Sequence, residues 1–369
     1  MNDGTSEQAR HADLVRDAFA RGQAALAGGD KAEAARWLDR AHRLAPDDGT
    51  ITLVLASAMI GGENAKAAEL FAEVLKSHDV RDAWFGLATA RFLNGDLIGA
   101  RAALAKLLSL HALRSDTADL ADQVARAVGA AGWCGLTGDG ALVVNPTGSG
   151  RISSKADGRQ INGGLLSPGW PRATRLTVMA ARRHLLGSPI SLEAVGRVEG
   201  HVEPWEGGVR GWAWCPGDPD TDPRLSVGAG RTGIEIVATE LAGSIHGLAP
   251  LARPRSFEIS WAKLPIAPKA VRIRGRDGRD LSGSPVELFP RRHPLSSGRH
   301  PPSSGPHPPS SGRHPLSSGR HPLSSGPHLL SSVPHPLSSV RHPRARPGDQ
   351  SRHPAGTDPR VKPEDHGEG

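Results

Sequence analysis

The sequence predicts a multidomain chain in which a helical-hairpin array precedes small antiparallel β-sandwich modules and a disordered tail. Glycine turns recur at Gly29, Gly62 and Gly95, and from Gly132 onward short β-rich runs replace the helical pattern. Near the C-terminal end a seven-residue unit repeats. These observations divide the chain into a helical array with a capping helix (8–131), a first β module (132–192), a second β-sandwich module (196–289) and a tail (290–369).

An apolar stripe that repeats behind each glycine turn predicts the array. A small residue, a large apolar residue and a third apolar residue follow each turn at i, i+4 and i+7, so one helix face is apolar. The stripe consists of Ala34, Leu38 and Ala41, then Ala67, Phe71 and Val74, then Ala100, Leu104 and Leu107. A period of 33 to 34 residues is typical of stacked helical hairpins. Each glycine is expected to end a helix with a positive φ angle.

Short β-branched or alternating runs between Gly, Pro and Asp turns predict the β modules. The expected strands are 141–144, 175–179, 198–202, 210–214, 224–227, 234–238, 257–261 and 270–273. Two recurring segments indicate a duplication, with convergence on a common strand-and-turn pattern as the alternative. Gly132-Trp133-Cys134 matches the segment from Gly211 to Cys215, and Leu186 to Leu192 matches Leu281 to Leu288. This match places Cys134 and Cys215 at equivalent positions.

The tail is predicted to be extended and disordered. His293, His300 and His307 begin a ladder of histidines that recur every seven residues, and nearly every unit contains proline. Proline removes a helix donor and clashes with the preceding turn, so the period does not indicate a coiled coil. The histidines could bind metal ions only loosely, and we expect no evolved metal site.

Charge and cysteine content argue against several classes of protein. The formal charge is +7, but the tail from Arg291 holds eleven Lys+Arg and five Asp+Glu, which accounts for +6 of it. The folded part is therefore near neutral, and we expect no specific nucleic-acid partner. The two cysteines lack metal-site spacing. With no signal-peptide pattern and no apolar run of about 20 residues, we expect a cytoplasmic protein without a membrane span or a cofactor.

Three motifs could suggest chemistry. Gly228 to Gly233 matches a dinucleotide-binding loop, but the next residues alternate like a strand, so a hairpin turn is favoured. The turn of Asp218, Asp220 and Asp222 does not match a calcium loop and lacks the apolar strand that precedes the Asp-x-Asp of sugar-nucleotide transferases. It is expected to be a solvated turn.

Trp212 and Trp214 lie two residues apart and would share one face of a strand. Stacking on a glycan is one reading of this pair. Packing in the small β core is the other.

The helical part resembles the tetratricopeptide repeat. The third repeat carries that family's pattern best, in Trp84, Leu87, Ala88, Gly95, Ala100, Leu104 and Leu107. The resemblance implies a scaffold that binds a protein partner and has no chemistry of its own. Trp84, Leu87 and Arg91 are the candidate partner-binding residues.

The second β module resembles a domain that precedes the catalytic domain in some large bacterial glycosyltransferases. The resemblance is carried by Val198 to Val202, Gly211 to Pro216 and Ile273 to Pro285. No catalytic segment of that family follows, so no catalytic residue carries over. We expect a non-enzymatic interaction scaffold, a truncated relative of such enzymes. The alternative is a carbohydrate-binding or transferase protein whose activity the sequence does not reveal.

Overall fold

A computed structural model describes residues 3–161, 173–229, 232–243, 245, 248–263 and 270–287. The chain divides into two compact units, 1–334 and 335–369, and every described residue belongs to the first. The predictions made for the tail at 290–369, including its histidine ladder, lie outside the described residues.

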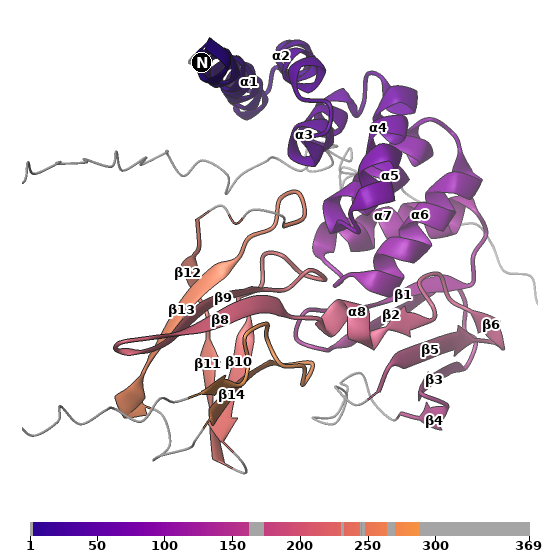
Figure 1. Ribbon diagram of the computed structural model, residues 1–369. Coiled ribbons are helices and arrows are strands. Elements are labelled where there is room, and N and C mark those ends of the chain that lie inside the picture. The colour runs from indigo at the N-terminus through magenta and orange to yellow at the C-terminus, as the bar shows by residue number, and fades with distance from the viewer. Residues whose placement is uncertain are drawn as a thin grey trace, which may run out of the picture. The chain divides into compact units, whose positions relative to one another are not determined.

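Seven helices form the N-terminal region, and neighbouring helices pack against one another in sequence order (Figure 1). They are α1 (Asp3–Ala27), α2 (Lys31–Leu44), α3 (Gly49–Met59), α4 (Asn64–Ser77), α5 (Arg81–Leu93), α6 (Leu97–Leu110) and α7 (Ser115–Ala127). The side chains of Asp30, Asp48 and Asp96 accept backbone N–H groups at the starts of α2, α3 and α6, which explains why those helices begin there. Among the described helices, none combines the length and apolarity needed to cross a membrane.

The apolar stripe predicts the helical core correctly. All nine stripe residues are buried, with exposed fractions of 4 % or less. The turn glycines agree at two positions of three, since Gly29 and Gly95 have φ angles of 80° and 79°. In the middle turn the positive φ of 93° falls on Gly61 instead of Gly62. There the helix ends one residue earlier than the strict 33-residue spacing predicts.

The first β region forms a two-stranded sheet and a second sheet of five strands that differ in length. Its strands are β1 (Gly132–Leu136), β2 (Leu142–Pro146), β3 (Ile152–Ala156), β4 (Arg159–Gln160), β5 (Arg175–Ala180), β6 (Arg183–His184) and β7 (Ile190–Ser191), followed by helix α8 (Leu192–Gly196). Strands β1 and β2 pair as a hairpin, and the other sheet has the order β4-β3-β5-β6 with β7 also on β5. All pairings between these strands are antiparallel.

The second β region contains two four-stranded antiparallel sheets around one core. Its elements are β8 (Glu199–Trp205), β9 (Gly208–Trp214), β10 (Arg224–Ala229), β11 (Thr232–Val237), β12 (Glu240–Leu241), β13 (Arg255–Ser260), the 3-10 helix η2 (Trp261–Lys263), β14 (Ala270–Gly275) and β15 (Val286–Glu287). The orders are β12-β13-β9-β8 and β11-β10-β14-β15. Inward side chains of both sheets, from Val198 to Val286, share one apolar cluster. All eight expected strands are present. The sequence did not predict β1, β3 or the two-residue strands.

The same hydrogen bonds close both β regions. Ser188 Oγ accepts the backbone N–H of Val178 at 2.9 Å, and Ser284 Oγ accepts that of Ile273 at 2.9 Å. Each serine stands in a Gly-Ser-Pro segment whose glycine has a positive φ. The closing segments therefore correspond as the sequence suggests.

The opening strands correspond in a different register from the predicted one. Parallel bridges join Trp133 to Leu186 and His201 to Ser282, so Trp133 corresponds to His201. The predicted match between Gly132-Trp133-Cys134 and the segment ending at Cys215 is therefore wrong. The Gly-Trp-Cys letters recur, but strand pairing sets the correspondence, and Cys134 occupies the place of Val202.

The helical array and the first β region contact each other at α7 and β1. The backbone N–H of Leu113 donates to Leu136 O at 2.8 Å. The Asp122 carboxylate of α7 accepts both Trp133 Nε1 at 2.6 Å and Asn145 Nδ2 at 2.7 Å. The array therefore docks on the β region where the composition of the sequence changes.

Candidate functional site

Strand β9 divides its side chains between the core and an outer face. Val209, Ala213 and Cys215 belong to the apolar core cluster of the second β region. Because side chains alternate along a strand, Arg210 and Trp212 lie on the opposite face. Trp212 is half-buried and Arg210 is exposed.

Antiparallel pairing extends this outer face into two rows across three strands. In one row Trp212 stands opposite His201 of β8 and Ser256 of β13. In the other, Arg210 stands opposite Glu203 of β8 and Glu258 of β13.

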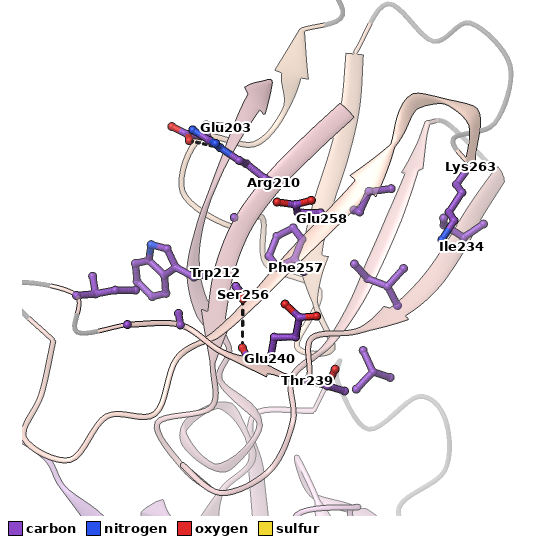
Figure 2. A pocket seen from close by; sticks show the side chains of 17 residues that line it. Glu203, Arg210, Trp212, Ile234, Thr239, Glu240, Ser256, Phe257, Glu258 and Lys263 are labelled. Atoms are coloured by element: carbon purple, nitrogen blue, oxygen red, sulfur yellow. Dashed lines mark hydrogen bonds and ion pairs between the residues drawn. The ribbon is translucent and has the colours of Figure 1, made fainter. Parts of the chain in front are cut away.

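The rows hold polar groups close to one indole ring. Arg210 Nε donates to Glu203 Oε1 at 2.8 Å, and Figure 2 shows this pair with Glu258, Ser256 and Trp212 along the neighbouring strands. Ser256 Oγ donates to the carbonyl oxygen of Glu240 at 3.3 Å. We call the set Glu203, Arg210, Trp212, Glu240, Ser256 and Glu258 the β9 face.

The residues of the β9 face line a pocket of about 690 Å³. Strand β12 pairs only with Arg255 and Ser256, so the rest of β13 borders the pocket along its edge. The apolar part of the lining comes from Phe257 of β13 and from Ile234 and Ile236 of β11. The pocket thus combines an apolar side with the polar rows described above.

The two predicted stacking residues have different environments. Trp212 lines the pocket, whereas Trp214 does not and is only 5 % exposed. Trp214 is one of the buried core side chains, as the core-packing alternative predicts for it, whereas Trp212 is not. A contact with a ligand is therefore open to Trp212 alone of this pair in the described conformation.

The predicted partner-binding residues all lie on α5, with different exposure. Leu87 is 3 % exposed and packs in the array. Trp84 is half-buried and donates Nε1 to Asp79 Oδ1 at 2.7 Å. Arg91 Nη1 donates to Gly99 O at 3.3 Å. The three residues are engaged in contacts within the array.

Asp79 also contacts a buried histidine. Its Oδ1 lies 3.2 Å from Nε2 of His111, which is 2 % exposed. The hydrogen bond with His111 outweighs partial burial and lowers the pKa of Asp79.

The acidic turn after β9 is held by arginines from distant parts of the chain. Arg114 lies 2.8 Å from Asp218 and 2.5 Å from Asp220. Arg255 Nε lies 2.8 Å from Asp222. Burial opposes the charge of Arg114, but the hydrogen bond and charge of Asp218 prevail and raise its pKa. The expected solvated turn is instead an ion-pair cluster, with Asp218 only 8 % exposed.

The acidic turn joins the array to the second β region. Arg114 precedes α7, and next to it the backbone N–H of Ala112 donates to Gly217 O at 2.8 Å. Asp220 also pairs with Arg253.

Both cysteines are buried free thiols. Burial raises the pKa of Cys134 to about 12 and that of Cys215 to about 11. Each thiol therefore stays protonated near neutral pH, where only the thiolate is a good nucleophile.

The glycine-rich segment is part of a hairpin, as predicted. Strands β10 and β11 pair from Arg224 and Val237 to Ala229 and Thr232, so a strand and not a helix follows the glycines. A dinucleotide loop needs the N-terminus of a helix at this point.

Sequence reasoning missed most of the β9 face. Glu203, Arg210, Ser256 and Glu258 come from segments up to 55 residues apart. The alternation of residues within a strand predicts which side chains share one face of that strand. It does not predict that β9 pairs with β13, and this pairing brings their side chains together. A search of the described residues finds no group of three His, Cys, Asp or Glu side chains arranged to hold a metal ion.

A scan of the chain against protein-family models gives no match, and no curated protein matches it.

Proposed function

We propose that the chain is a non-catalytic interaction scaffold, related to tetratricopeptide-repeat glycosyltransferases, that holds a protein or glycan partner. The observation that supports this best is the acidic turn, in which Asp218, Asp220 and Asp222 each have an arginine partner.

The ion pairs of the turn make it unsuitable as a metal-dependent transferase motif. An Asp-x-Asp motif works by offering carboxylate oxygens to a hard divalent cation. Here Arg114 neutralises two of these carboxylates, and its side chain is only 20 % exposed. Withdrawing both Asp218 and Asp220 to bind a metal would take away both of these partners of a largely buried guanidinium, which is strongly unfavourable.

The two thiols are likewise unsuitable for covalent catalysis. Cys134 and Cys215 are the only cysteines, and their raised pKa values keep them as neutral core side chains. They stabilise the two β cores instead of supplying a nucleophile.

A turnover assay tests the proposal. Purified full-length chain is incubated with UDP-glucose or GDP-mannose, with Mg²⁺ or Mn²⁺, and release of the nucleoside diphosphate is measured. We expect release equal to that of a heat-denatured sample. Turnover that exceeds this background in the native chain and disappears in Asp220→Asn would assign a catalytic role to the turn and refute the proposal.

A further inference from the structure

The β9 face has a counterpart in the first β region that is covered by a helix. Trp133 corresponds to His201 through the parallel bridges, and the partner of Trp133 across the hairpin, Asn145, corresponds to Trp212. Trp133 and Asn145 both donate to Asp122 of α7. In the first copy this side of the hairpin is therefore a binding surface for a helix.

The second copy keeps the hairpin, and the face is open to solvent. His201, Glu203 and Arg210 are exposed, and Trp212 is half-buried. Strands β12 and β13 enlarge the face with Glu240, Ser256 and Glu258.

The residue types exclude a helix as the favoured occupant of the second face. Gly135 of the first copy corresponds to Glu203, and a Cβ atom added at Gly135 would come within 3.1 Å of Leu113 and 3.4 Å of Leu108. Val143 corresponds to Arg210 by the same pairing. Charged side chains replace those that allowed close packing, and burying them under an apolar helix would cost their hydration.

We propose that the β9 face binds a neutral oligosaccharide. The indole of Trp212 offers a flat apolar surface for the C–H face of a pyranose ring. Around it, Glu258 and Glu240 accept hydrogen bonds from hydroxyl groups, while the Glu203–Arg210 pair both donates and accepts. A concave site with few polar groups beside apolar side chains is typical of small-ligand recognition.

The charges of the site select neutral sugars over anionic ones. Glu240 and Glu258 are exposed and have no ion-pair partner in the described part of the chain. The lining carries three carboxylates, Glu203, Glu240 and Glu258, against two cations, Arg210 and the exposed Lys263, and Arg210 is already paired with Glu203. An incoming carboxylate or sulfate would therefore meet a net negative charge.

This inference deepens the proposed function and rests on it only for the expectation that the bound sugar stays unchanged. The test is calorimetric titration of the full-length chain with neutral hexasaccharides of glucose, mannose or galactose, with a uronic-acid hexasaccharide as the charge control. We expect saturable binding of at least one neutral sugar and none of the acidic one. Chromatography of the sugar after titration reports turnover separately.

Substitutions locate the site. Trp212→Ala should weaken binding about tenfold or more, because a central tryptophan carries much of the affinity of a binding site. Trp37→Phe removes a half-buried tryptophan of α2, outside the face, and should leave affinity unchanged. Glu258→Gln, at an exposed position that folding tolerates, should weaken binding severalfold, and thermal melts check that each variant folds.

The outcomes separate the two proposals. If no neutral sugar gives saturable binding, the proposal of a sugar site is overturned. That result is expected if the face binds a protein helix instead. Equal affinity of Trp212→Ala and the parent chain overturns it as well. Binding accompanied by cleavage of the sugar supports the site and refutes the non-catalytic function, whereas binding without cleavage supports both.

Discussion

Close packing at single residues limits what the helical array tolerates. Gly86 of α5 lies against the Phe71 ring of α4, so that a Cβ atom added at Gly86 would overlap the ring. Phe71 itself is fully buried. The smallest side chain is therefore required where these helices cross, which a local sequence pattern alone does not reveal.

Gly86→Ala should destabilise the chain by about 1–3 kcal/mol, the usual cost of overpacking a core. The measurement is the free energy of unfolding in urea. Gly62→Ala is the matched control, because its Cβ would have no neighbour closer than 3.9 Å, and it should change stability by less than about 0.5 kcal/mol. Similar losses in both variants would contradict close packing as the cause.

The hydrogen bond from His111 lowers the pKa of Asp79. The free energy of unfolding should therefore depend on pH in the acidic range. Because the folded pKa lies below the unfolded value of about 3.9, this stabilisation is complete above that value. It is lost as the pH falls through the folded pKa. The free energy of unfolding of Asp79→Asn should therefore fall less between pH 5 and pH 3 than that of the parent chain. Equal acid dependence would show that Asp79 contributes nothing.

At the scale of elements, the acidic turn is the link between α7 and β9. Its side chains were predictable as turn formers from the local Asp and Pro pattern. Their partners were not, because Arg114 lies 104 residues before Asp218 and Arg255 lies 33 residues after Asp222. Local propensity predicts that a turn exists, but only the tertiary fold determines which charges meet there.

Arg114→Met should cost about 3 kcal/mol, since removing one member of a largely buried ion pair leaves the other without compensation. Urea unfolding measures the loss. Arg16→Gln breaks a pair whose members are 76 % and 69 % exposed and should change stability by less than about 1 kcal/mol. If Arg114→Met lowered the free energy of unfolding no more than Arg16→Gln does, the acidic turn would be an ordinary surface turn.

For the whole molecule, helix order and strand content followed from the sequence because both rest on short-range periodicity. Of the correspondence between the two β regions, the closing Gly-Ser-Pro segments followed from the sequence and the opening strands did not. Gly132-Trp133-Cys134 repeats in letters near Cys215, whereas the backbone bridges align Trp133 with His201. The β9 face was predicted only through Trp212, since its other members come together by pairing between distant strands.

The two buried thiols can report whether the molecule unfolds as one cooperative body. Cys134 belongs to the core of the first β region and Cys215 to that of the second. With Cys134→Ala and Cys215→Ala as single-thiol chains, we expect disulfide-exchange reagents to label the remaining thiol at the same urea concentration in both. Adding Arg114→Met should separate the two midpoints. Separate midpoints in the parent background would show that the acidic turn does not couple the regions.

The distance along the chain between Arg114 and Asp218 also orders events during synthesis. At about 5–20 residues per second, the ribosome makes Asp218 roughly 5–20 s after Arg114. The contacts of Asp122 with Trp133 and Asn145 span only 11 and 23 residues and become available much sooner. The contacts between helix α7 and β1 can therefore form first. The ion pair of Arg114 forms later, once Asp218 has been synthesised.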